Sequence, residues 1–172
     1  PTRVVAEAFG VQEAYGYVWV ALGPEPRPIP ELSHFADDNF RVIPCGPYDY
    51  KATGTRAIEN FLDMAHFPYV HAPYLGSEPH TEVLDYDVSL SSDRRSLSAT
   101  NCRFYQPSNN VSADGGYMSY SYRVSAPLLA TLTKDPEGDD PRVEAIMLAI
   151  QPLSEFESRG WISLAINYDH DV

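Results

Sequence analysis

Four side chains able to bind or tune a metal ion lie close together in this sequence: Asn60, Asp63, His66 and His71. Imidazole nitrogens and carboxylate oxygens are the ligands that divalent first-row metals take from proteins. Asn60, Asp63 and His66 are spaced three residues apart, so they would share one side of a helix. The segment therefore predicts a site where imidazoles meet beside a carboxylate.

His71 follows His66 by five residues, a rotation of about 500° on a continuous helix, which would point it away from that side. Pro68 lies between them. Because proline removes a backbone donor and clashes with the preceding turn, it is expected to end or kink the helix just after His66. The chain could then turn back and bring His71 to the same point as His66.

Ordinary structural roles remain open for these residues. Two histidines at this spacing also occur by chance, Asn60 could be a buried hydrogen-bonding residue, and Asp63 could be a solvated helix residue. Against this, burying polar groups without partners on the apolar side of a helix costs about 1–3 kcal/mol each. A metal or a shared network would remove that cost, and the residues alone leave both interpretations open.

The segment E-N-F-L-D-M-A-H-F-P-Y-V-H resembles the mononuclear iron motif of Rieske non-heme iron oxygenases, N-x-x-D-x-x-H-x-x-x-x-H. It is most similar to the vanillate O-demethylase-like branch. The segment VQEAYGYVWVALGPEP also resembles the last strands of that family's Rieske domain, so the resemblance covers nearly the whole chain. It implies that His66 and His71 ligate iron, that Asp63 carries electrons from a neighbouring subunit's cluster to His66, and that Asn60 lies near the iron.

The resemblance further implies an oxygenase component that activates O₂ at a mononuclear Fe(II). It would hydroxylate or oxidatively demethylate a small aromatic or similar apolar ring substrate. Electrons would come from a 2Fe–2S Rieske cluster served by a ferredoxin or flavin reductase, in a homotrimer. These expectations concern the whole protein, of which this chain would supply the catalytic-domain portion.

Two departures from the family pattern stand out. The cluster takes its ligands from C-x-H and C-x-x-H pairs, and Cys45 and Cys102 belong to neither, so the cluster is expected outside this chain. The third iron ligand, a carboxylate, is expected shortly after Val172, with Asp169 and Asp171 as alternatives. The chain would then be part of a longer protein or a remnant without oxygenase activity.

The segment Gly23–Pro30 carries prolines at alternate positions, which predicts a stiff, extended connector. Residues 1–30 are therefore expected to be the C-terminal tail of a Rieske domain with this connector. Residues 31–172 are expected to form the mononuclear iron catalytic domain, truncated.

Thr55 is expected to cap a helix that runs to Met64 or His66. Alternating apolar residues predict a later strand with Met118, Tyr120 and Tyr122 on one face, where packing in the sheet core is favoured over lining a substrate pocket. One helix followed by about five antiparallel strands implies an α+β fold with a curved antiparallel sheet around the helix. The resemblance specifies an incomplete helix-grip, START-like domain. The other strands are expected at 3–9, 14–22, 40–52, 84–90, 97–105, 142–151 and 160–168, with loops at 106–116 and 133–141.

The 172 residues carry a net charge of −12, from 24 acidic and 12 basic residues. A nucleic-acid partner is not expected, because binding phosphates requires a cationic face. No apolar run is long enough to span a membrane, and the two cysteines are expected to be reduced in the cytoplasm.

Two rival functions remain. The first is a helix-grip module that binds an apolar ligand without redox chemistry. The second is a zinc hydrolase, although the sequence lacks the H-E-x-x-H arrangement that supplies a general base. The metal that binds, iron, zinc or none, would separate the three hypotheses.

Overall fold

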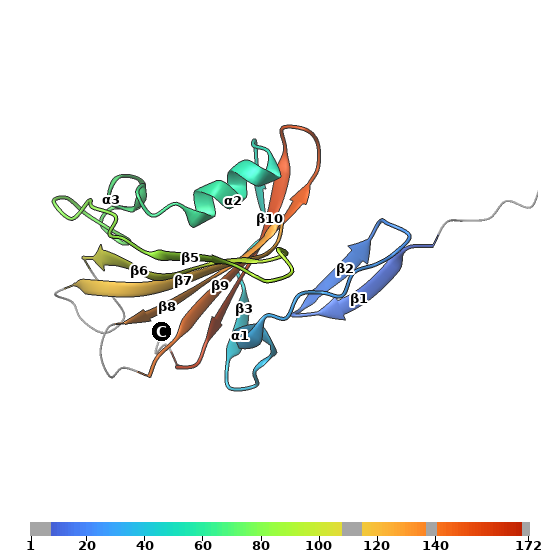
Figure 1. Cartoon of the computed structure of the whole chain (residues 1–172), viewed down its shortest axis with the longest axis horizontal. Helices are drawn as coiled ribbons and strands as arrows, with labels where there is room; N and C mark the ends of the chain where they lie inside the picture. Colours follow the sequence, from blue (N-terminus) through green and yellow to red (C-terminus); the bar gives the residue numbers. More distant parts are fainter. Residues whose placement is uncertain (1–7, 108–114, 137–140, 170–172) are drawn as a thin grey trace, which may run out of the picture.

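The computed structural model describes residues 8–107, 115–136 and 141–169. It contains three short helices and ten strands in these ranges, most of them in one antiparallel sheet (Figure 1). In chain order they are β1 (Gly10–Ala14), β2 (Tyr17–Ala21), α1 (Ser33–Ala36), β3 (Arg41–Pro44), β4 (Tyr48–Tyr50), α2 (Gly54–Leu62), α3 (Phe67–Val70), β5 (Asp87–Leu90), β6 (Leu97–Gln106), β7 (Gly116–Ala126), β8 (Leu129–Pro136), β9 (Glu144–Pro152) and β10 (Ser158–Ile166).

The main sheet has eight strands in the order β3-β10-β9-β8-β7-β6-β5, and β4 pairs with β10 beside β3. From β5 to β10 each strand pairs with the next one along the chain, so this part is a meander. The sheet is curved and does not close, because β3 and β5 lie at opposite edges. This confirms the expected antiparallel sheet with few helices.

One face of the sheet is covered by α2 and α3 (Figure 1). Side chains alternate between the two faces of a strand, and Met118, Tyr120 and Tyr122 of β7 all point toward the helices. Phe67 of α3 and Ile58 of α2 pack onto this face. The aromatic stripe expected from the sequence is therefore buried beneath the helices that carry the candidate site.

The opposite face packs against α1 and the β1–β2 hairpin. Tyr17 and Trp19 of the hairpin and Phe35 of α1 contact a cluster that includes Met147 and Ala165. The Tyr17 hydroxyl lies 2.6 Å from Ser163 Oγ. The hairpin that was expected to end a separate domain thus packs directly on the main sheet.

The second half of strand β8 was expected to be loop, since residues 133–141 form a polar segment that contains glycine and proline. The alternation of Ala130 and Leu132 with Thr131 and Thr133 overrides that composition, because it suits a strand with one buried face. The first strand also begins at Gly10, whereas 3–9 was expected, and residues 1–7 lie outside the described residues.

The predicted helix is shorter than expected and differently capped. Thr53, and not Thr55, is the N-cap, where its hydroxyl accepts a hydrogen bond from the Arg56 N–H at 3.2 Å. The helix ends at Leu62, before Asp63 and His66. A separate turn, α3, follows, so the expectation of a single helix was wrong.

Within the described residues, no helix combines the length and apolar character needed to cross a bilayer.

Candidate metal centre

Asp63 and His66 lie in the short connection between α2 and α3. Asp63 takes an extended backbone conformation (φ −79°, ψ 126°), and its N–H still donates to Glu59 O at 3.1 Å. Its Oδ1 accepts a hydrogen bond from the Ala65 N–H at 3.0 Å, which fixes the tight turn. The chain therefore leaves the helix at Asp63 and places His66 at the start of α3.

His66 and His71 occupy the two ends of α3. Pro68 lies in the first turn of α3, where a missing backbone donor costs nothing. The His71 N–H donates to Phe67 O at 3.1 Å, closing the turn. Pro68 thus helps to begin a second helix, whereas the sequence interpretation had it ending the first.

The two imidazole rings are side by side. Their centroids lie 4.9 Å apart, with an angle of 62° between the ring planes. Phe67 contacts both rings at centroid distances of 5.1 and 6.2 Å, and the same ring packs on Tyr120 of the sheet at 6.1 Å. The histidines are therefore held together by α3 and anchored to the sheet through Phe67.

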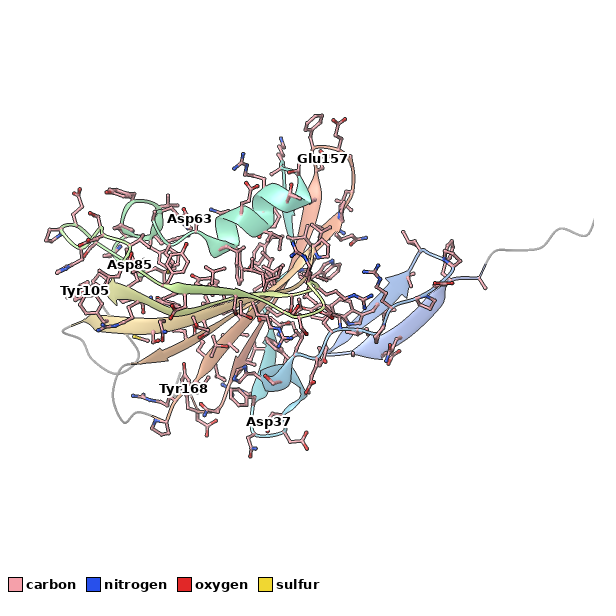
Figure 2. The ribbon with its side chains drawn as sticks, viewed as in Figure 1. Asp37, Asp63, Asp85, Tyr105, Glu157 and Tyr168 are labelled. Carbon is pink, nitrogen blue, oxygen red and sulfur yellow. The ribbon has the colours of Figure 1, made fainter. Side chains whose placement is uncertain are left out.

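Asp63 orients His66. Its Oδ2 lies 2.9 Å from His66 Nδ1, and Figure 2 shows Asp63 where α2 gives way to α3. A carboxylate there favours the tautomer with a proton on Nδ1, which leaves Nε2 as the free nitrogen. Burial raises the pKa of Asp63, but hydrogen bonds from His66 and the Ala65 N–H outweigh it and hold that pKa below its usual value.

The electrostatics favour an uncharged second imidazole. Partial desolvation lowers the pKa of His71, and the nearby His66 lowers it further. A neutral imidazole is the form that binds a metal. The lowered pKa of His71 therefore favours the form of that imidazole that can ligate a divalent ion.

Asn60 lies on the exposed side of α2, and in the described part of the chain it binds neither histidine. The Asp63 side chain is 46% exposed, whereas that of His66 is 14% exposed. The expectation that Asn60, Asp63 and His66 share one buried helix side was therefore wrong, because the helix ends before Asp63. The cost of burying polar groups without partners therefore does not arise here, because Asn60 and Asp63 are exposed and His66 is hydrogen-bonded to Asp63.

The donor set fits part of a non-heme iron site. Such a site takes two histidines and a carboxylate on one face of the metal. His66 and His71 can supply the two imidazoles, but the described residues contain no group of three possible ligands. Asp169 is exposed, and Asp171 lies outside the described residues.

Gly76 allows α3 to sit where it does. It is buried, and a Cβ on it would lie 2.8 Å from Pro68 N and 3.0 Å from Phe67 C, both backbone atoms of the turn that carries the histidines. The sequence analysis did not single it out, since a lone glycine in a polar loop gives no periodic signal.

We expect Gly76→Ala to displace α3, because backbone atoms cannot rotate away as a side chain can. The free energy of unfolding should fall by about 1–3 kcal/mol, and metal binding should weaken with it. Denaturant unfolding and metal content of the purified variant measure the two effects. Gly23→Ala, at a position with nothing within 4 Å, is the matched control and should change neither. Equal unfolding free energies and metal contents in the two variants would show that the close approach of Gly76 to α3 does not determine the position of α3.

Residues 50–171 match the family model of the vanillate O-demethylase oxygenase C-terminal domain. The probable methylxanthine N7-demethylase NdmC of Pseudomonas sp. (strain TJI-51) is 41% identical over 145 residues, covering 84% of this chain and 51% of that protein. This chain thus spans about half the length of that relative.

Solved structures show the same fold. NdmA of Pseudomonas putida CBB5 with caffeine superposes with a TM-score of 0.74 at 21% identity, covering 100% of this chain and 51% of that one. Dicamba monooxygenase bound to 3,6-dichlorosalicylic acid superposes with a TM-score of 0.72 at 17% identity, covering 95% and 52%. With the family match over residues 50–171, these findings confirm the expected resemblance: the chain belongs to the vanillate O-demethylase oxygenase C-terminal domain family, as a catalytic-domain portion of a Rieske non-heme iron oxygenase.

Proposed function

We propose that this chain is the part of an oxygenase component that holds a mononuclear Fe(II) through His66 and His71. The observation that carries the proposal is the pair of imidazoles 4.9 Å apart, with Asp63 bound to the first. The third ligand would be a carboxylate outside the described residues. The covering helices and curved sheet would form the helix-grip arrangement of a START-like domain.

The iron, when bound, would supply the site at which O₂ is activated. The chain's own residues would set the conditions for that chemistry. Asp63 would accept a hydrogen bond from the Nδ1–H of His66 and so leave Nε2 free to ligate the metal. Because the Asp63 side chain is 46% exposed, a neighbouring subunit could reach it, which supports a role in electron transfer between subunits.

The substrate proposed is a methylxanthine, and the reaction is oxidative N-demethylation. The support is the relative named a methylxanthine demethylase, which is similar over 84% of this chain. In this reaction the methyl carbon leaves as formaldehyde and nitrogen gains a proton, while O₂ and two electrons with two protons yield the inserted oxygen and water. Hydroxylation or O-demethylation of a carbocyclic ring is the alternative that the dicamba monooxygenase likeness leaves open.

The remaining parts of the proposal concern the whole protein. Residues 1–30 would end a Rieske domain whose 2Fe–2S cluster receives electrons from a ferredoxin or flavin reductase, and the assembly would be a homotrimer. A cytoplasmic location is proposed because Cys45 and Cys102 are both free thiols.

The test uses the full-length protein that contains this chain, loaded with iron and supplied with a reductase. Incubation with caffeine or theobromine under air should release formaldehyde in a one-to-one ratio with the demethylated xanthine. Zinc in place of iron, or tight ligand binding without turnover by the iron-loaded protein, would replace the proposal by the hydrolase or binding-module hypothesis, respectively.

A further inference from the structure

Three polar side chains are buried under the candidate site without a hydrogen-bond partner. They are Gln106, Tyr120 and Tyr122, which are 1%, 2% and 3% exposed. Both carboxamide atoms of Gln106 and both tyrosine hydroxyls are unpartnered in the part of the chain that the structure describes. Gln106, expected in a loop, is instead the last residue of β6.

The three residues share the sheet face that carries the helices. Tyr120 pairs across the strands with Cys102, and Gln106 lies four residues further along β6, on the same side. Tyr122 follows Tyr120 by two residues, and their rings stack at a centroid distance of 6.3 Å. The three residues therefore lie along one face of β6 and β7, and are here called the Gln106 cluster.

The Gln106 cluster borders the metal centre. The ring of Phe67, which touches both histidines, packs on Tyr120 at 6.1 Å and on Phe104 at 5.6 Å. Burial raises the pKa of Tyr122, and Cys102 and then Asp63 raise it further. A small ring compound seated on this face would lie beside the histidine pair.

The members of the cluster do not satisfy one another. Burial raises the pKa of the Tyr120 phenol, and a hydrogen-bond interaction with Gln106 lowers it. That contact falls short of hydrogen-bond geometry, so the hydroxyl and both carboxamide atoms have no partner among the described residues. A buried donor or acceptor without a partner costs about 1–3 kcal/mol. Several such atoms on one face are what a binding site shows when its polar groups are shaped for a ligand.

The chemistry of the cluster distinguishes between substrates. A carboxamide offers one donor and one acceptor side, and each phenol offers both, so the group suits ring carbonyls and ring nitrogens. The neighbouring charges, Lys134 and Glu144, pair with each other at 3.7 Å. Phe104 and Met118, buried in the same core cluster, add apolar contact. A carboxylate would find Lys134 already paired with Glu144, whereas an uncharged heteroaromatic would find matching partners.

We propose that Gln106, Tyr120 and Tyr122 are the specificity-determining residues of the substrate pocket, and that they select an uncharged nitrogen heteroaromatic with ring carbonyls over a carbocyclic carboxylate. The inference rests on the proposed function, since it places the substrate beside His66 and His71. It goes beyond the proposed function by naming the residues that contact the substrate ring and the chemical reason why an uncharged heteroaromatic is preferred.

Equilibrium binding to the full-length protein tests this, with theobromine as the uncharged heteroaromatic and dicamba as the carboxylate. Wild type should bind theobromine about tenfold more tightly or better. Gln106→Leu and Tyr120→Phe should each weaken theobromine binding by about tenfold and leave the weak binding of dicamba unchanged. Gln12→Leu, on the exposed hairpin strand β1, is the matched control and should bind both probes as wild type does.

Thermal unfolding of the same variants provides a second measurement. Because Gln106→Leu replaces an unpartnered buried amide by an apolar side chain, its Tm should be equal to or above that of wild type. A clear fall in Tm would mean that Gln106 is bonded within the folded protein, and would overturn the inference. The inference would also be overturned if Gln106→Leu and Tyr120→Phe both bound theobromine with wild-type affinity, or if the wild-type protein bound dicamba more tightly than theobromine.

Iron content, measured on the same samples, separates this inference from the proposed function. Theobromine binding that depends on Gln106 in a protein without iron would overturn the proposed function and support the inference. Iron bound through His66 and His71, together with theobromine binding that is unchanged in Gln106→Leu, would support the proposed function and overturn the inference.

Discussion

Replacing His66 or His71 with alanine is expected to remove iron from the full-length protein. Each substitution deletes one of the two imidazoles whose rings lie 4.9 Å apart, so the metal would lose a third of its protein ligands. Iron content should fall by about tenfold or more, because even loss of a residue that only supports a ligand costs about 10–100-fold in metal affinity. Metal analysis after gel filtration measures the loss, and demethylation should disappear with the iron.

His34→Ala is the matched control for these variants. His34 lies in α1 on the opposite face of the sheet, where its ring packs on Phe40 at 5.0 Å. The His34→Ala variant should retain the iron content of the wild-type protein. Stoichiometric iron in His66→Ala or in His71→Ala would refute that residue's assignment as a ligand, and equal losses in all three variants would indicate general unfolding.

Asp63→Asn is expected to separate iron binding from turnover. The amide oxygen of asparagine can still accept a hydrogen bond from the Nδ1–H of His66, so the tautomer and most of the iron should be retained. The negative charge is lost, and with it the basicity that a carboxylate confers on the bound imidazole. Coupled turnover should therefore fall by about 10–100-fold. Single-turnover product yield and iron content, measured on one preparation, give the two values.

Glu59→Gln provides the control for the loss of charge. Glu59 is a turn earlier on α2, where it pairs with Arg56 at 2.6 Å on the exposed surface, and its neutralisation should leave turnover near the wild-type rate. Unimpaired turnover in Asp63→Asn would remove its proposed role between subunits. Loss of iron in that variant would instead make Asp63 a residue on which the metal site itself depends.

The meeting of His66 and His71 was predicted from the sequence, but for a partly wrong reason. The helical spacing of Asn60, Asp63 and His66 suggested one helix side, yet α2 ends at Leu62 and a second turn carries the histidines. The contact between Asp63 and His66 survives this change because a tight turn also brings residues three apart together. Helix ends depend on capping and on tertiary contacts such as that of Gly76, which spacing does not report.

The fold was predictable where the residue alternation was strong and was missed where composition dominated. Strands β9 and β10 were expected within about two residues of their ends. In β8 the polar segment that begins at Thr133 was predicted to be loop, although Thr133 lies on the outer face of a strand whose inner face carries Ala130 and Leu132. The Gln106 cluster was hidden for a related reason. Whether Tyr120 and Tyr122 line a pocket or only fill a core depends on the partners of their hydroxyls, and a sequence does not show those.

The most direct test of the metal centre is anomalous diffraction from crystals of the full-length protein, recorded above and below the iron absorption edge. One iron peak within about 2.1 Å of a ring nitrogen of both His66 and His71 is the predicted result. An iron peak that touches neither ring, or histidines bound only to protein partners in a crystal that contains iron elsewhere, would contradict the proposal.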